Sequence, residues 1–218
     1  MDLHLVLALA VAGMLLSLVP GPDLLFVVTS GVLGGRRAGV LAALGMSAGL
    51  VVQTVAAAFG LGVLIQSAPQ ALQIVRLFGA AVLVYMAVAA WRSSRTAEPL
   101  QVSSAPRRSL RRTYVMATLT NLANPKVILF YLAFLPQFLT TGEQAWPVTA
   151  QMLILGGMFI LVGLAVYATA ALVSGILSEK FTARPQWRRT MQRVSAVVFG
   201  GLAARLVIES RVTARQSW

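Results

Sequence analysis

The chain has 218 residues, of which 58% are hydrophobic and only 11% are charged, and its mean hydropathy is +0.80. A soluble core cannot bury that much apolar surface, so the composition excludes an ordinary soluble domain and indicates an integral membrane protein. The formal net charge of +12 suits an anionic membrane surface better than nucleic acid, because the arginines cluster in short gaps between apolar runs. With no cysteine and one histidine, we expect no disulfide, no metal site and no cofactor.

Six apolar runs follow one another along the chain, and all but the last approach or exceed the ~20 residues that cross a bilayer as a helix. Helix is the expected form, since the runs are longer than the ~10 residues of a barrel strand and lack strict alternation. The first run has no basic leader and no small-residue cleavage site, so we expect a retained span. The predicted fold is an all-α integral membrane protein with six transmembrane helices, at residues 3–33, 40–65, 69–91, 114–139, 148–177 and 194–208.

Positive charge alternates between the gaps that separate these runs. Thirteen of the eighteen basic residues follow the first, third and fifth runs, whereas the gaps "QSAPQ" and "TTGEQAWP" hold none. By the positive-inside rule, the arginine-rich gaps are cytoplasmic and both termini lie outside. The polar stretch 93–112 then forms a cytoplasmic loop. It joins halves 1–92 and 113–209 of a single transmembrane transporter domain that covers residues 1–218.

Three spans on each side of this loop give the halves opposite orientations, which is a 3+3 inverted repeat. The first span contains "PGPDLLF" and the fourth contains "NPKVILF", each with proline, then a charged residue, then an apolar run into phenylalanine. Interrupted apolar segments at corresponding positions of two halves point to a midplane binding site in secondary transporters. We therefore predict that helices 1 and 4 are broken.

The first break is expected at Pro20, Gly21 and Pro22. The two prolines remove backbone donors and the glycine permits a bend, so the helix stops and restarts with Pro22 in its first position. Asp23 then lies in the first turn, where the helix dipole favours a carboxylate. It is also the only acidic residue in any predicted span, and a carboxylate in lipid is costly unless it faces a polar cavity. Both a dipole-stabilised helix start and a functional role are open for it.

The second break presents the opposite charge. Asn124 can cap a new helix whose first residue is Pro125, which puts Lys126 in the first turn. A cation is unfavourable at that end, so Lys126 needs an anion nearby. The anion is either Asp23 in an internal salt bridge or a ligand carboxylate that also meets the free N–H groups of the helix start. Asn121, one turn earlier, is expected to satisfy freed carbonyls.

Other polar and small residues inside the spans give weaker signals. The glycines of "GVLGG" and "GMSAG" predict close helix packing and allow a homodimer without requiring one. Arg205 lies near a span end, where a long cationic side chain reaches for the interface. Five further polar residues fit hydrogen bonds between helices better than the lining of a path: Gln53, Thr54, Tyr131, Tyr167 and Thr169.

Three longer stretches, "PGPDLLFV", "GRRAGVLAALGMSAG" and "NLANPKVILFYLAFLPQF", together with the six-span layout, resemble the LysE/RhtB family of amino-acid exporters. The family pattern of Asn, two residues and Asn-Pro-Lys is matched at 121–126, and its Pro-Gly-Pro element at 20–22. The resemblance implies an exporter of amino acids or their derivatives in the bacterial cytoplasmic membrane, driven by an ion gradient. It leaves the substrate side chain open.

A zwitterionic amino acid needs partners of both signs. We therefore predict substrate binding by Asp23, Asn121, Asn124 and Lys126, with the ammonium near Asp23 and the carboxylate near Lys126. Asp23 is the expected proton carrier, since its surroundings would change during a transport cycle. The alternative is an exporter of metal ions or other small solutes, although no intramembrane Cys or His offers ligands for soft metals. An enzyme is not expected, because a second carboxylate or a convincing nucleophile and base are missing.

Overall fold

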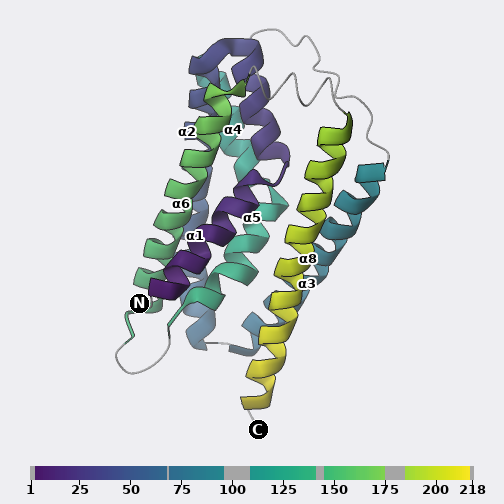
Figure 1. The fold of residues 1–218 in the computed structure, drawn as a ribbon. Helices are drawn as coiled ribbons and strands as arrows, with labels where there is room; N and C mark the ends of the chain where they lie inside the picture. The colour runs from purple at the N-terminus through teal and green to yellow at the C-terminus, as the bar shows by residue number, and fades with distance from the viewer. Residues whose placement is uncertain (1–2, 68, 96–108, 141–144, 175–184, 217–218) are drawn as a thin grey trace.

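The structure is a computed structural model that describes residues 3–67, 69–95, 109–140, 145–174 and 185–216 (Figure 1). Every regular element in these ranges is helical, which confirms the prediction of an all-α protein. The α-helices are α1 (Leu3–Leu18), α2 (Pro22–Ser67), α3 (Pro69–Arg95), α4 (Leu110–Leu122), α5 (Pro125–Leu129), α6 (Val148–Leu172) and α8 (Pro185–Gln216). After α5 the chain continues as a π-helix, η1 (Phe130–Phe134), and a 3₁₀-helix, η2 (Leu135–Phe138).

The long helix α2 doubles back on itself at Gly35. This residue has φ 78° and ψ 177°, a backbone conformation that favours glycine. Figure 1 shows the first part of α2 rising to one end of the molecule and the second part returning from it. The break separates the first two predicted spans, and Arg36 and Arg37 follow it as exposed side chains.

Several predicted boundaries differ from the observed ones, most clearly those of the last helix and of the loop 93–112. The helix α8 begins at Pro185 rather than at 194, because its arginine- and glutamine-containing start is polar but still compatible with helix. The predicted loop 93–112 is shortened from both sides, by the end of α3 and by α4, whose start is capped by the Ser109 side chain. Residues 96–108 of that loop lie outside the described ranges.

Several helices have the length and composition of membrane spans. Pro22–Gly60, Leu77–Arg95 and Val148–Leu172 each qualify, and the segment from α4 to η2, bent by 48° at its break, makes a fourth if it counts as one span. Large apolar side chains cover the outside; for example, Phe59 is 61% exposed and Tyr85 is 72% exposed. Such a surface fits lipid rather than water, so the chain is an all-α integral membrane protein.

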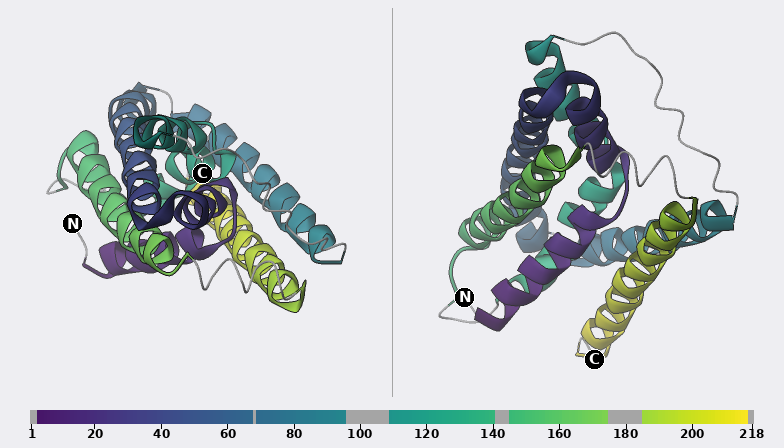
Figure 2. Two further views of the ribbon diagram at one scale, coloured as in Figure 1. Left: turned by 90° about the horizontal axis from the view of Figure 1, so that it is seen from above. Right: turned by 45° about the horizontal axis from the view of Figure 1, so that its top comes forward.

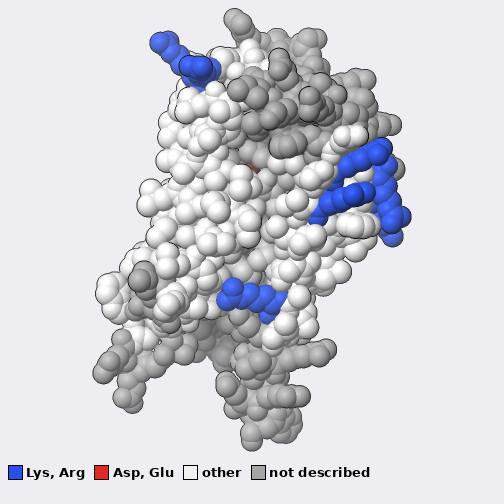
Figure 3. All heavy atoms as spheres, viewed as in Figure 1, with Lys and Arg blue, Asp and Glu red and all other residues white. Residues whose placement is uncertain are grey.

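The helices form two groups. Helix α2 packs mainly against α6 and α4, whereas α3 packs mainly against α8, and the view from above shows the α3–α8 pair on one side of the molecule (Figure 2). Both chain ends lie at one end of the bundle, opposite the bend of α2 (Figure 1). On the face in Figure 3, most of the basic surface gathers at the bend and over the upper ends of α3 and α8, and one further basic group lies nearer the other end. This arrangement agrees with the predicted clustering of arginines on one side of the membrane.

Helices α2 and α4 approach closely at two glycines of "GMSAG". A Cβ atom on Gly45 would lie 2.8 Å from the Cβ of Ala117, and one on Gly49 would lie 2.6 Å from Oδ1 of Asn121. The Thr118 hydroxyl also donates to the Gly45 carbonyl at 3.0 Å. The prediction of close packing is confirmed here, and the contact holds Asn121 against α2.

The second glycine stretch makes a similar contact with α6. Gly31 of "GVLGG" lies against Ser174, just beyond α6, and a Cβ on Gly39, four residues after this stretch, would lie 3.0 Å from the Cβ of Ala171. Both glycine stretches thus serve contacts within the chain. Because these glycines pack within the chain, they give no support for a homodimer interface, and the homodimer stays a prediction.

Replacing Gly49 by Ala is expected to destabilise the protein by about 1–3 kcal/mol, because the added methyl group overpacks the contact with the buried Asn121 side chain. The measurement is denaturant unfolding of the purified protein in detergent. Gly60→Ala is the matched control, since it lies in the same helix and its Cβ would have no neighbour within 4 Å. Equal stability of the two variants would contradict the importance of this contact.

Candidate functional site

The two helix breaks bring opposite charges into the interior. Helix α1 ends at Leu18 and α2 begins at Pro22, whereas α4 ends at Leu122 and α5 begins at Pro125. The charged residue after each of these prolines is buried: Asp23 is 0% exposed and Lys126 is 2% exposed. Both charges therefore need partners inside the protein.

The Asp23 carboxylate joins three helices. Its Oδ2 atom accepts a hydrogen bond from Asn121 Nδ2 of α4 and another from the Tyr167 hydroxyl of α6, both at 3.3 Å. Asn121 was expected to bind freed backbone carbonyls, but its side-chain amide instead donates to the carboxylate. Tyr167 was assigned only a general interhelical bond, and it is in fact a direct partner of Asp23.

Lys126 is held by backbone carbonyls at the end of α1. Its Nζ donates to Leu16 O at 3.1 Å and to Val19 O at 3.3 Å. Carbonyls at a helix C-terminus have no partner within the helix and carry the negative end of its dipole, so they suit a cation. Among the described residues, no ion pair of 4.0 Å or less joins Lys126 to Asp23. The lysine is thus held by backbone carbonyls rather than by the predicted salt bridge to Asp23, and the ligand carboxylate stays a prediction.

The charged residue at each break contacts the broken helix at the other break. From α5, Lys126 reaches the end of α1, and from α2, Asp23 reaches Asn121 in the last turn of α4. Asn124 caps α5 as expected, since its Oδ1 accepts from the Lys126 backbone N–H at 3.0 Å. Gly21 lies against the lysine, because a Cβ there would be 3.4 Å from its Nζ. Each half of the chain therefore supplies a charged side chain to the broken helix of the other half.

Four buried polar atoms around these residues have no hydrogen-bond partner in the described part of the chain: Asp23 Oδ1, Gln53 Oε1, Asn121 Oδ1 and Asn124 Nδ2. In each amide, the hydrogen bond made by one atom shows which atom is the nitrogen and which is the oxygen. For example, Gln53 Nε2 donates to the Asn121 backbone carbonyl at 3.0 Å, which leaves Oε1 as the atom without a partner. The Asn124 amide faces the Asp23 carboxylate without reaching hydrogen-bond geometry. Native proteins leave few such atoms unpaired, so this cluster is a candidate for binding a polar ligand.

The remaining polar residues have structural partners. Thr54 and Tyr131 share a hydrogen bond of 2.7 Å between α2 and η1, which confirms the interpretation as an interhelical contact. The Thr169 hydroxyl instead donates to the Ala165 carbonyl within its own helix, so the predicted interhelical bond is wrong for this residue. The candidate site is thus confined to the two breaks and the side chains that meet Asp23 and Lys126.

Comparison with known proteins gives several relatives. A homoserine/homoserine lactone efflux protein of Salmonella typhimurium is 34% identical over 160 residues, which cover 72% of this chain and 75% of the relative. An uncharacterized membrane protein of Vibrio cholerae is 31% identical over 72% of this chain and 74% of its own length. Another, from Bacillus subtilis, is 26% identical over 93% of this chain and 98% of its own length.

No solved structure matches the chain. Residues 14–210 match the family described as LysE type translocator, and this range includes both helix breaks and all the residues that meet at them. A translocator is a transporter and not an enzyme. From the family match and the relatives together, the chain belongs to the LysE type translocator family.

Proposed function

We propose that the chain is a secondary-active, proton-coupled exporter of amino acids or small amino-acid derivatives. The efflux protein of Salmonella typhimurium named above supports this substrate class, since homoserine and its lactone both carry an amino group on a small polar framework. The observation that carries the proposal is the pair of buried opposite charges at two adjacent helix breaks, surrounded by polar atoms that have no partner in the described ranges.

The substrate ammonium binds on the Asp23 side of the site. An ammonium group has three N–H donors and no acceptor. Asp23 Oδ1, Asn121 Oδ1 and Gln53 Oε1 are acceptors without a partner among the described residues. A cationic amino group therefore complements this side in both charge and hydrogen bonding.

The opposite end of the substrate meets the second break. The two carbonyl bonds use two of the three N–H donors of Lys126, which leaves one donor for a ligand. Asn124 Nδ2, whose amide faces the Asp23 carboxylate, is a second donor without a hydrogen-bond partner among the described residues. Together they suit the carboxylate of an amino acid or the carbonyl oxygen of a lactone.

Protons and substrate use the same carboxylate in turn. Asp23 is the one acidic side chain among the buried polar residues of the described chain. A group that binds the substrate ammonium in one state and a proton in the other links the two movements, because each leaves before the other binds. Transport of the amino group outward is thereby coupled to proton entry.

The proposed architecture has six spans in a 3+3 inverted repeat within the bacterial cytoplasmic membrane, with both termini outside. The two corresponding breaks support the repeat, and the arginine-bearing end opposite the termini supports the orientation. The six spans are then α1 together with the first part of α2, the second part of α2, α3, the segment from α4 to η2, α6 and α8.

The test is growth of an overexpressing bacterial strain on inhibitory homoserine, on amino-acid analogues and, in a separate arm, on metal salts. We expect several-fold higher tolerance to at least one amino compound and lower cellular levels of that compound. A strain that makes equal amounts of Asp23→Asn should resemble the empty vector. Tolerance gained only against metal salts would support the alternative exporter and reject the amino-acid proposal.

A further inference from the structure

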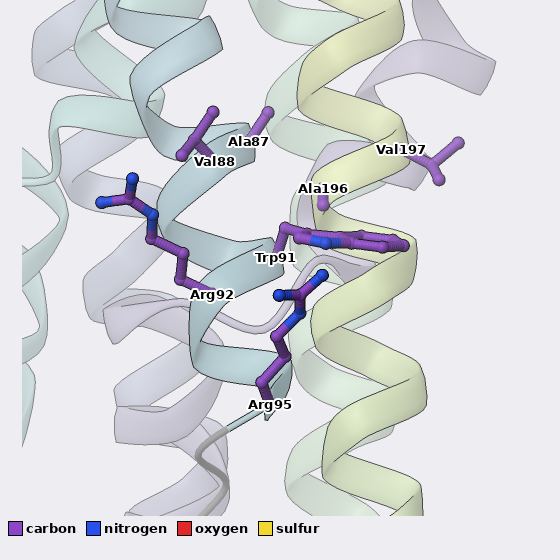
Figure 4. A pocket seen from close by; sticks show the side chains of 7 residues that line it. All are labelled: Ala87, Val88, Trp91, Arg92, Arg95, Ala196 and Val197. Carbon is purple, nitrogen blue, oxygen red and sulfur yellow. The ribbon is translucent and has the colours of Figure 1, made fainter.

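A groove between α3 and α8 lies apart from the buried polar site. It has a volume of about 370 Å³ and opens at the surface near the end of α3 (Figure 4). Its lining residues are Ala87, Val88, Trp91, Arg92 and Arg95 of α3, and Ala196 and Val197 of α8. None of them takes part in the proposed transport chemistry.

The inner part of the groove is apolar. Ala87 and Val88 face it from α3, and Ala196 and Val197 face it from α8. Val88 is 44% exposed and Val197 is 69% exposed, so the groove presents hydrocarbon surface to its surroundings. A purely polar ligand would gain nothing from these walls.

The outer part of the groove is cationic. Arg92 and Arg95 form the last turn of α3, and Arg193 of α8 has its guanidinium 6.0 Å from the centre of the Trp91 ring. All three arginines are exposed, and none forms an ion pair within the described residues. Figure 4 shows the Trp91 indole extending toward α8, with the Arg95 guanidinium beneath it. Tryptophan at the end of a span is typical of the lipid headgroup region.

We infer that this groove binds an anionic diacyl phospholipid. The lipid phosphate pairs with Arg95 and Arg193 beside the Trp91 indole, and Arg92, which extends away from α8 in Figure 4, adds positive charge at the same end of α3. The indole lies at the level of the headgroup, and one acyl chain runs along the apolar wall between the helices. Basic pockets between transmembrane helices on the cytoplasmic side suit anionic lipid headgroups. A free phosphate ion would use the arginines alone, whereas the combination of cationic rim and apolar wall fits a lipid.

The test uses purified protein in a neutral detergent, to which phosphatidylglycerol or phosphatidylcholine is added. Native mass spectrometry then counts the lipid molecules retained. We expect preferential retention of phosphatidylglycerol, and an apparent affinity at least about tenfold weaker in the triple variant Arg92→Gln, Arg95→Gln, Arg193→Gln. The matched control is Arg36→Gln, Arg37→Gln, which removes exposed arginines from the same end of the molecule but outside the groove. Soluble glycerol phosphate should compete poorly.

Three results would overturn the inference: equal retention of the two lipids by the wild type, an equal loss in the triple variant and the control, or effective competition by glycerol phosphate. If the triple variant does not yield folded protein, the exposed single change Arg95→Gln gives the same comparison with a smaller expected loss, of about threefold. Retention unchanged in that single variant would also count against the groove.

Discussion

Replacing Asp23 by Asn is expected to abolish proton-driven substrate movement in membrane vesicles. Asparagine has nearly the same shape, and its side-chain oxygen can still accept from Asn121 and Tyr167, so the local fold is retained. The negative charge and the exchangeable proton are both lost. Because hydrogen bonds to a charged group contribute about 1.5–3 kcal/mol, substrate affinity should also fall by at least about tenfold. The measurement is accumulation of labelled substrate in inverted vesicles under an imposed pH gradient.

The control for this result is Ser47→Ala in the same vesicles. Ser47 is also buried in α2, but within the described residues its hydroxyl bonds only to the Ala43 carbonyl one turn earlier. We expect near-normal transport by this variant. Fully coupled transport by Asp23→Asn would remove Asp23 from the mechanism and leave it as a structural helix start.

Replacing Lys126 by Met is expected to lower the free energy of unfolding by about 3 kcal/mol. The thioether keeps the length of the side chain but leaves the buried carbonyls of Leu16 and Val19 without their cationic donor. The contact between the two halves is weakened with them. Denaturant unfolding in detergent measures the loss, and transport of every substrate should fall, whether or not that substrate carries a carboxylate.

Ile128→Met is the matched control for this variant, because Ile128 lies in the same short helix and is 36% exposed. It should change stability little. If Lys126→Met were as stable as this control and lost only the transport of carboxylate-bearing substrates, Lys126 would be a substrate ligand alone and not a structural link between the halves.

The helix breaks were predictable because their signals are local. Pro22 and Pro125 each suit the first position of a helix, and Asn124 suits the position before it. The turn between the first two spans was also predictable from the short polar gap between two apolar runs, although Gly35 itself was assigned to helix packing and not to the bend. Such features depend on residues within one or two turns, which is why a single sequence carries them.

The partners of the charged residues were not predictable in the same way. Lys126 meets α1 carbonyls and Asp23 meets Tyr167, and both contacts join segments more than a hundred residues apart in the chain. Every residue also has a backbone carbonyl, so the sequence does not show which carbonyls will bind the lysine. Only the arrangement of the two breaks reveals them.

The contacts of Arg205 were also not predictable from the sequence. It was expected to extend toward the membrane interface, but its half-buried guanidinium lies 5.5 Å and 4.8 Å from the ring centres of Phe134 and Phe138. The aromatic rings come from η1 and η2, whose π- and 3₁₀-helical turns the apolar pattern did not distinguish from α-helix. The cation therefore contacts ring faces that only the fold brings beside α8.

The competition between substrate and proton for Asp23 is tested most directly by calorimetric titration of the purified protein with homoserine in two buffers of different ionisation enthalpy. The difference between the buffers gives the number of protons released per substrate bound. We predict release of about one proton by the wild type and none by Asp23→Asn. Binding of equal affinity and equal proton release in both proteins would contradict the assignment of Asp23 as the shared site.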